Sequence, residues 1–413
     1  MTLSLLFAGS TCGFGIGTIV VERILNFLGQ FNYKQPRNTL LPASPLLAKL
    51  RGNILSKEDI GSSVSQARFL VLIIGCVLHS THFVLMGIRK GFGSMFLAYA
   101  IAAFARALWT AENAYFALGP KQSLGYSYGL WSFGGVVSPL ICQAITSKKV
   151  PWSHFYFGSL VLSVLNLAFL VLTFRPTDTE LNHERREAAA KTTKPLTEDY
   201  FSAISSTVED PFAPSSPTST ERSPNNSTLR LAIAMPLVWA LSICSMLYSG
   251  TLMVTFLLQA RHADPNGAGY VTSGFWGGIT VGRFIWGFLT PRLTYTQRKI
   301  LVQVTLAVAL TMHLLIWFTK SIFGNALCAS IIGLLYGPVF PAFLSMATDI
   351  LPTDVHLVSM AIIALLPFIA GTILGVKGAQ TLTYFTVASG IVLTCLWAIL
   401  PSRIPADQMR DKN

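Results

Sequence analysis

The chain has 413 residues, of which 52% are hydrophobic and only 12% charged, and its formal net charge is +12. Soluble domains carry about 25% charged residues, so this composition excludes a water-soluble globular enzyme and predicts an integral membrane protein. In a soluble chain the positive charge would indicate nucleic-acid binding. Here the basic residues lie in short segments between apolar stretches, so membrane topology explains them and we expect no nucleic-acid partner.

The chain contains eleven apolar stretches of about 20 residues, the length that crosses a bilayer as a helix. In chain order they are 3–26, 69–88, 95–118, 125–145, 154–174, 231–257, 270–289, 300–317, 322–346, 358–375 and 384–400. The sequence therefore predicts an all-α polytopic membrane protein. Its six cysteines lie in six different stretches, none of them at metal-ligand spacing, so we expect neither a metal site nor a cofactor.

A polar segment rich in Ser, Thr, Pro and acidic residues divides the chain into two membrane halves. It covers 176–229, and its composition is typical of a disordered linker. The expected organisation is an N-terminal half over 1–175 with five spans, the linker, a C-terminal half over 230–402 with six spans, and a tail over 403–413. A second polar segment, 31–66, interrupts the N-terminal half and has no apolar run of spanning length.

The two halves resemble repeats of one unit. A Gly-x3-Gly-x3-Gly stripe begins at Gly9 and recurs at Gly274, an offset of 265, whereas Gly93 recurs as Gly324, an offset of 231. The difference of 34 residues between these offsets locates an insertion between the first two spans, where the polar segment 31–66 lies.

The same offsets predict that one helix is missing. The C-terminal half has a span, 231–257, before its glycine stripe. Subtracting 265 places the counterpart of this span before residue 1. We therefore expect about eleven spans of a twelve-helix design, with the first helix absent from the chain.

The distribution of Lys and Arg predicts the orientation in the membrane. With the N-terminus outside and the linker in the cytoplasm, the cytoplasmic segments hold 20 basic residues and the outer segments seven. Cytoplasmic loops of membrane proteins carry such an excess of positive charge. The linker and the tail 403–413 are accordingly expected on the cytoplasmic side.

Two motifs carry a family resemblance. The segment 274–284, Gly-Phe-Trp-Gly-Gly-Ile-Thr-Val-Gly-Arg-Phe, and the segment 110–113, Thr-Ala-Glu-Asn, followed by Leu118-Gly119-Pro120, resemble fungal relatives of the fucose–proton symporter (fucose permease-like) group of the major facilitator superfamily. The resemblance covers nearly all the chain except the two polar segments. It implies two six-helix bundles that work as a transporter by alternating access.

The chain departs from the resembled group at the positions that bind protons. In the fucose permeases an acid stands at the position of Trp109, and the nearest acid here is Glu112. The other proton-binding acid of that group belongs to the first helix. The resemblance thus leaves proton coupling open, and a sugar as the substrate follows from it only by analogy of fold.

Polar residues within the spans predict the substrate site, because each ionisable group costs about 2.5–3.5 kcal/mol at the bilayer centre. Arg106, Trp109 and Asn113 follow i, i+3, i+7 spacing and share one helix face. This face would offer a cation, an aromatic ring and an amide to a polar solute. The alternative is that Arg106 is neutralised by another helix. Glu112 points away from this face and is expected to act in gating or coupling.

The C-terminal half supplies further candidates. A break at Gly337-Pro338 lies between Tyr336 and Phe340, and broken helices mark binding sites in transporters, so both aromatic residues are expected to bind substrate. Arg283, beside the glycine stripe, is expected to make an interhelical contact that holds one end closed. Tyr128, Trp131 and Trp276 are weaker candidates for the substrate cavity, because aromatic residues at helical spacing usually pack. The histidines are expected to pack between helices or to lie at the membrane interface, namely His79, His82 and His313.

The leading hypothesis is a monomeric secondary active transporter, not an enzyme. Its expected partners are the lipid bilayer of the plasma membrane or the vacuole, a small polar solute (a sugar or an organic anion) and, as a candidate coupling ion, the proton. Two alternatives stay open: a non-transporting membrane receptor or scaffold on a transporter fold, and an inactive truncated gene product.

Overall fold

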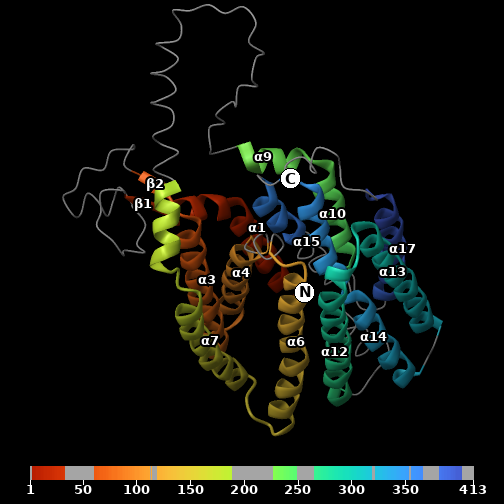
Figure 1. Cartoon of the computed structure of the whole chain (residues 1–413). Coiled ribbons are helices and arrows are strands. Elements are labelled where there is room, and N and C mark those ends of the chain that lie inside the picture. Colours follow the sequence, from red (N-terminus) through yellow and green to blue (C-terminus); the bar gives the residue numbers. More distant parts are fainter. Residues whose placement is uncertain are drawn as a thin grey trace, which may run out of the picture.

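The structure, a computed structural model, describes residues 2–32, 60–111, 113, 119–187, 227–248, 265–318, 321–352, 355–365 and 381–401. The N-terminal half contains α1 (Thr2–Leu28), β1 (Gln30–Asn32), β2 (Ile60–Ser62), α3 (Val64–Gly87), α4 (Phe92–Ala111), α6 (Ser123–Ser147) and α7 (Ser153–Phe174). The C-terminal half contains α9 (Ser227–Ala234), α10 (Pro236–Tyr248), α12 (Pro265–Leu289), η2 (Thr290–Arg292), α13 (Tyr295–Phe318), α14 (Ile322–Tyr336), α15 (Val339–Ile350) and α17 (Thr381–Ile399). Figure 1 shows the two halves side by side, with α6 and α12 adjacent where they meet.

The predicted all-α membrane architecture is confirmed. Within the described residues, seven helices are long and apolar enough to cross a membrane: Ala8–Leu28, Val64–Gly87, Phe92–Thr110, Ser123–Ser147, Ser153–Phe174, Tyr295–Ile316 and Phe323–Ile350. Shorter apolar helices cover Pro236–Ser245, His356–Leu365 and Val387–Ile399. The predicted span 270–289 coincides with the 25-residue α12, and parts of the predicted spans 231–257 and 358–375 lie outside the described residues.

The packing of the helices repeats between the halves. In the N-terminal half α4 packs against α1 and α3, and α3 packs against α7. In the C-terminal half α14 packs in the same way against α12 and α13, and α13 packs against α17. The repeat inferred from glycine spacing thus extends to which helices touch.

Helix caps give a second sign of the repeat. Ser63 precedes α3, and its side chain accepts a hydrogen bond from the backbone amide of Gln66. Thr294 precedes α13, where the side chain of Gln297 accepts a bond from the Thr294 amide at 2.9 Å. Both pairs are Ser/Thr-x-x-Gln, the pattern of a capping box. The offset within each pair, 294 − 63 and 297 − 66, is again 231.

The glycine stripes bring helix backbones together. A Cβ atom added to Gly13 of α1 would lie 2.0 Å from the carbonyl oxygen of Ala100 in α4. A Cβ atom added to Gly278 of α12 would lie 2.1 Å from the carbonyl oxygen of Ser330 in α14. Only glycine fits such a helix crossing. The predicted close helix contact at the stripe of α12 is therefore present, and α1 makes the same contact.

The halves meet along α6 and α12. At one end a Cβ atom added to Gly125 would lie 2.5 Å from the Cα atom of Gly287. Further along, the hydroxyl of Ser273 donates a hydrogen bond to the carbonyl oxygen of Val136 at 3.0 Å. This pair of helices therefore forms a continuous contact between the halves.

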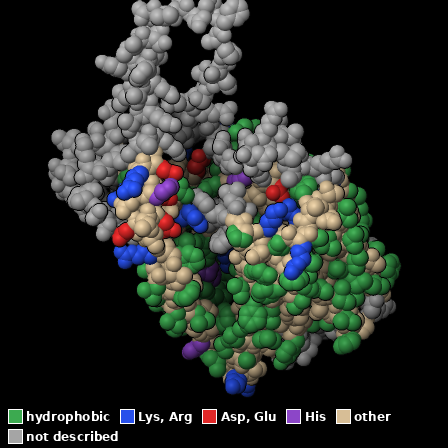
Figure 2. Space-filling view, in the orientation of Figure 1, with side chains coloured by type: hydrophobic (Ala, Val, Ile, Leu, Met, Phe, Trp, Pro, Cys, Tyr) green, Lys and Arg blue, Asp and Glu red, His purple; other side chains and the backbone are tan. Residues whose placement is uncertain are grey.

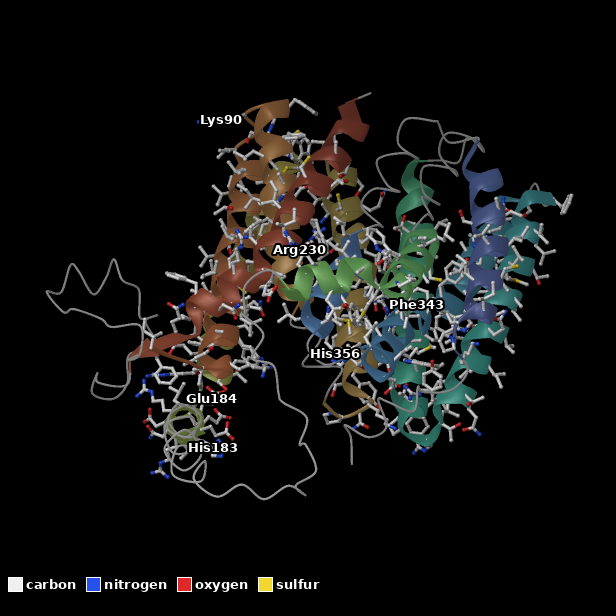
Figure 3. All side chains as sticks on the ribbon, turned by 90° about the horizontal axis from the view of Figure 1, so that it is seen from above. Lys90, His183, Glu184, Arg230, Phe343 and His356 are labelled. Atoms are coloured by element: carbon white, nitrogen blue, oxygen red, sulfur yellow. The ribbon has the colours of Figure 1, made fainter. Side chains whose placement is uncertain are left out.

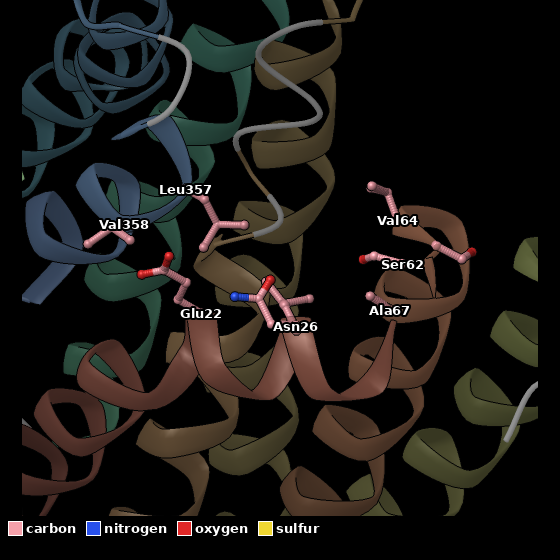
Figure 4. A pocket seen from close by; sticks show the side chains of 9 residues that line it. Glu22, Asn26, Ser62, Val64, Ala67, Leu357 and Val358 are labelled. Carbon is pink, nitrogen blue, oxygen red and sulfur yellow. The ribbon is translucent and has the colours of Figure 1, made fainter. Parts of the chain in front are cut away.

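A second contact joins α1 to the helix His356–Leu365. Phe14 and Ala364 belong to one buried cluster. Towards the end of α1 a pocket of about 200 Å³ lies between the halves, where Glu22 and Asn26 approach Leu357 (Figure 4). We call this end of the molecule, at which α1 and α7 end and α3 and α6 begin, the linker end.

The ends of the predicted insertion 31–66 are part of the fold. Strands β1 and β2 pair antiparallel, with Phe31 opposite Gly61. The side chain of Gln66, which is buried, donates hydrogen bonds to the carbonyl oxygens of Leu28 and Gln30. Helix α3 also begins at Val64 instead of residue 69, because Ser63 caps it. Residues 33–59 of the insertion lie outside the described residues.

The expectation of a linker disordered throughout 176–229 is wrong for its first part. Residues 178–187 form a helix, here called the linker helix. Thr177 and Glu180 form a capping box at its start, because the Glu180 carboxylate accepts bonds from the Thr177 amide and hydroxyl and the Thr177 hydroxyl accepts from the Glu180 amide. Residues 188–226 lie outside the described residues.

Glu184 docks the linker helix on the start of α3. Its carboxylate accepts hydrogen bonds from the hydroxyl of Ser63, from the amide of Ser65 at 3.1 Å and from the hydroxyl of Ser65 at 2.7 Å. Negative charge is favourable at a helix N-terminus. Figure 3 places Glu184 at one end of the N-terminal half and Lys90, in the turn after α3, at the other.

The surface has the pattern of a protein in a bilayer. Hydrophobic side chains cover most of the face shown in Figure 2, and charged side chains gather beside the grey residues at its upper margin. Along α7 only its first residue, Ser153, is buried inside the protein. Such an apolar exposed surface fits a lipid environment, and the chain is therefore an integral, multi-pass membrane protein.

Candidate functional site

A cluster of aromatic side chains lies where α6 meets the C-terminal half. Tyr128 and Trp131 are one helical turn apart on α6, with ring centroids 6.4 Å apart. The ring of Trp131 meets that of Trp276 in α12 edge-on at 5.5 Å, and the ring of Tyr128 meets that of Phe340 in α15 edge-on at 5.1 Å. Edge-to-face contacts at these distances are favourable. We call these four residues, together with Arg283 and Asn113, the Tyr128 cluster.

Arg283 provides the positive charge of the cluster. Its guanidinium donates a hydrogen bond to the carbonyl oxygen of Tyr128 at 3.0 Å. The guanidinium carbon lies 5.3 Å from the ring centroids of both Tyr128 and Trp131, within the range of cation–π attraction. Arg283 is almost fully buried. The expected interhelical contact of Arg283 is thus present, and it joins the two halves.

Two of the predicted substrate residues reach this cluster. Asn113, beyond the end of α4, lies beside the hydroxyl of Tyr128. Phe340 lies directly after the break at Gly337-Pro338, so the break places its ring against Tyr128. Tyr128 therefore connects a candidate from the N-terminal half with one from the C-terminal half.

Exposure distinguishes the members of the cluster. Trp131 is 61% exposed, although it contacts two aromatic rings and a guanidinium. Tyr128, Trp276 and Phe340 are half-buried. A large aromatic side chain this exposed beside a buried cation offers a planar face to a solute.

Arg106 and Trp109 do not join Asn113, although the three share a face of one helix. The ring of Trp109 lies 5.3 Å from that of His79 in α3, and its indole fills the space left by Gly75, where an added Cβ atom would lie 2.2 Å away. Trp109 therefore packs between α4 and α3. Its expected role in substrate binding stays a prediction.

The Arg106 side chain is exposed and lies in the electrostatic field of His79, His82 and Tyr99. These three neighbours all lie in the N-terminal half, and the expected role of Arg106 in substrate binding stays a prediction. Figure 2 shows a hollow in the surface between the column formed by α3 and α7 and the centre of the molecule.

Tyr336 also lies elsewhere. Its hydroxyl is 3.1 Å from Nε2 of His313 in α13, and both side chains are buried. Tyr336 thus connects α14 to α13 within the C-terminal half, and its expected role in substrate binding stays a prediction. Glu112, the other expected gating or coupling residue, lies outside the described residues.

Sequence reasoning kept Tyr128, Trp131 and Trp276 only as weaker candidates and did not identify them as the centre of a cluster. A signal was available: Tyr128 and Trp131 follow i, i+3 spacing on α6. The arginine that their rings need as a partner lies 155 residues from Tyr128 along the chain, and the sequence shows no such pairing.

The fold and the site can now be compared with known proteins. The family model described as Major Facilitator Superfamily matches residues 61–375. The chain belongs to the Major Facilitator Superfamily. Bypass of stop codon protein 6 of Saccharomyces cerevisiae is 24% identical over 317 residues, which are 69% of this chain and 58% of that protein. The matched region thus spans less than two thirds of the yeast relative.

Two solved structures of the superfamily share the fold. The E. coli fucose:proton symporter has a TM-score of 0.51 and 14% identity, with 96% of each chain covered. The human organic anion transporter MFSD10 has a TM-score of 0.54 and 16% identity, with 96% of this chain and 98% of that chain covered. The resemblance stated from the sequence is confirmed at the level of the superfamily, and the fold is that of a secondary transporter.

Proposed function

We propose that this chain carries a small polar solute, a sugar or an organic anion, across the membrane by alternating access, and that the Tyr128 cluster contacts the solute. The observation that supports this is Arg283. It belongs to α12 of the C-terminal half, and its guanidinium donates a hydrogen bond to the backbone carbonyl oxygen of Tyr128 in the N-terminal half. A solute that competes for these groups would change how firmly the halves hold together, and alternating access requires that coupling.

The chemistry of the cluster favours an anionic or hydroxylated solute with a flat face. The cluster offers one guanidinium, one amide and the faces of four aromatic rings. None of its members is acidic, and the guanidinium of Arg283 repels a cationic solute. The two neighbours described above are a fucose:proton symporter and an organic anion transporter, and their solutes have these two chemistries.

Proton coupling is a separate part of the proposal. Glu22, on α1, lines the pocket between the halves at the linker end, beside Leu357. A carboxylate at a contact that must open and close could bind the coupling proton. Flux that rises when a pH gradient is imposed, and that loses this response in Glu22→Gln, would support a symporter.

The test is flux through the full chain reconstituted in liposomes, measured with labelled hexoses and organic anions. Trp131→Ala removes the exposed ring of the cluster, and Leu130→Ala is the matched control because Leu130, the next residue, is 67% exposed. Loss of one stacking or cation–π contact between the Trp131 ring and the solute, worth up to about 1.5 kcal/mol, predicts a loss of kcat/KM of up to about tenfold. The control should keep flux within about twofold.

Equal flux in the two variants would refute the role of the cluster. Absence of saturable flux for every solute tested, with specific binding retained, would refute transport and favour the receptor hypothesis. Arg283→Lys distinguishes the contribution of the positive charge from that of the guanidinium contacts. Lysine keeps the cation and loses the planar guanidinium that lies against both rings.

A further inference from the structure

A second pocket, of about 290 Å³, lies at the linker end of the N-terminal half, away from the Tyr128 cluster. Its walls come from the first two turns of α3, from the last residues of α7 and from the start of the linker helix. Arg68, Arg175 and Glu180 are its charged side chains, and Phe69 and Phe174 are among its apolar ones.

The pocket lies at the depth of lipid headgroups. The membrane-spanning helix α3 begins at Val64, and α7 ends at Phe174, so the pocket sits where both helices leave the apolar layer. Phe174 is 49% exposed and Leu172, half a turn before it, is 83% exposed. The pocket therefore has acyl chains on one side and water on the other, with the cations between them.

The charges of the pocket match a zwitterion better than an anion. Two guanidiniums can hold one phosphate group, for which arginine is the preferred partner. Glu180 lies in the field of Arg68, and its carboxylate is fixed by two hydrogen bonds from Thr177. An anionic headgroup without an amine would place its charge beside this carboxylate, and a primary ammonium would instead neutralise it.

We propose that this pocket binds the headgroup of a phospholipid with a primary ammonium, with its phosphate between Arg68 and Arg175 and its ammonium on Glu180. The lipid whose headgroup has only these two groups is phosphatidylethanolamine. The acyl chains lie along the exposed apolar face of α7. The linker helix closes the pocket, so lipid binding also holds this helix against α3.

The experiment is native mass spectrometry of the full chain in detergent with added lipids of equal chain length. Phosphatidylethanolamine should be retained at least fivefold more than phosphatidylcholine, whose trimethylated nitrogen donates no hydrogen bond, and more than phosphatidic acid, which lacks the amine. Arg175→Gln should reduce retention of phosphatidylethanolamine by about fivefold. Arg186→Gln, an exposed charge change on the same linker helix, should leave it unchanged.

Glu180→Gln tests the ammonium contact by itself. It should abolish the preference for phosphatidylethanolamine over phosphatidylcholine while both lipids stay bound through the phosphate. Equal retention of the three lipids by the unsubstituted chain, or no effect of Arg175→Gln, would overturn the proposal. Displacement of the lipid by free phosphoethanolamine at equal concentration would show a site for a soluble headgroup and would overturn it as well.

Discussion

The close helix crossing at Gly278 makes a quantitative prediction. A Cβ atom at this position would lie 2.1 Å from the carbonyl oxygen of Ser330 and 2.7 Å from the amide nitrogen of Leu334. An ordinary carbon–oxygen contact is about 3.3 Å, so Gly278→Ala requires α12 and α14 to separate by roughly 1.2 Å. The obstructing atoms are backbone atoms of a helix, so no side chain can turn aside to make room.

The cost of this substitution should lie at the upper end of the range for overpacking, about 3 kcal/mol. Alanine is favoured over glycine within a helix by up to about 1 kcal/mol, which leaves a net loss of about 2 kcal/mol. In a half of roughly 200 residues this lowers the melting temperature by about 4–8 °C. The assay is thermal unfolding of the purified protein in detergent, followed by near-UV circular dichroism.

Gly277→Ala is the matched control. It lies next to Gly278 in the same helix, and no atom of the residues that the structure describes lies within 4 Å of the position where its Cβ would stand. This control should gain only the stability that comes from the higher helix propensity of alanine. Its melting temperature should therefore equal or slightly exceed that of the unsubstituted protein. If Gly278→Ala and Gly277→Ala have the same melting temperature, α12 and α14 are not in backbone contact, and the reasoning from the glycine stripe fails.

Three further predictions concern polar contacts. Arg298 is 4% exposed and lies 2.9 Å from the carboxylate of Asp349. Asp349→Ala removes this ionic partner and should destabilise the protein by about 3 kcal/mol in the same melting assay. A smaller loss of stability for Asp349→Ala than for the double variant with Arg298→Met would contradict this. Glu184→Gln should speed amide exchange and proteolysis of the linker helix without changing the melting temperature of the spans, since the docking contact alone is weakened. Hydrogen bonds from Thr177 hold the pKa of Glu180 below its ordinary value of 4.5. The cap of the linker helix should therefore be complete above pH 4.5 and be lost as the pH falls through the lowered pKa of Glu180. Backbone amides of the linker helix that exchange without protection already at pH 5 would refute this.

The fold was predictable because its signals are averages over many residues or short repeated patterns. Composition and stretches of about 20 apolar residues identify spans, and the stripes that begin at Gly9 and Gly274 place two helix pairs in equivalent contacts. The capping box at Thr177 and Glu180 is also a short sequence pattern, and by itself it predicts the start of the linker helix. The polar and acidic composition of the whole segment instead favoured disorder.

The site was predictable only in part, because helical spacing gives the face of a helix and not its neighbour. Trp109 and Asn113 share a face, yet Trp109 turns to α3 because Gly75 leaves room for an indole, and Asn113 reaches Tyr128 on α6. Tyr336 lies against His313, where its hydroxyl and the imidazole Nε2 are within hydrogen-bonding distance. These partners lie far apart in the chain, and no local pattern records them.

Backbone contacts at glycines hold helices together within each half, and side-chain contacts at the Tyr128 cluster join the two halves. Within each half, glycines let helix backbones touch, as at Gly13 and Gly278, and such contacts cannot change without separating the helices. Between the halves the backbones of α6 and α12 also meet at one end, at Gly125 and Gly287, whereas other contacts depend on side chains, namely Arg283 on Tyr128 and the hydroxyl of Ser273 on α6. A side chain can exchange one acceptor for another by a change of rotamer, so these contacts can open while each half stays intact. It follows that Gly278→Ala should lower stability, whereas Arg283→Lys should lower flux with little change in melting temperature; a variant of Arg283 that melts like Gly278→Ala would place this side chain within the rigid core.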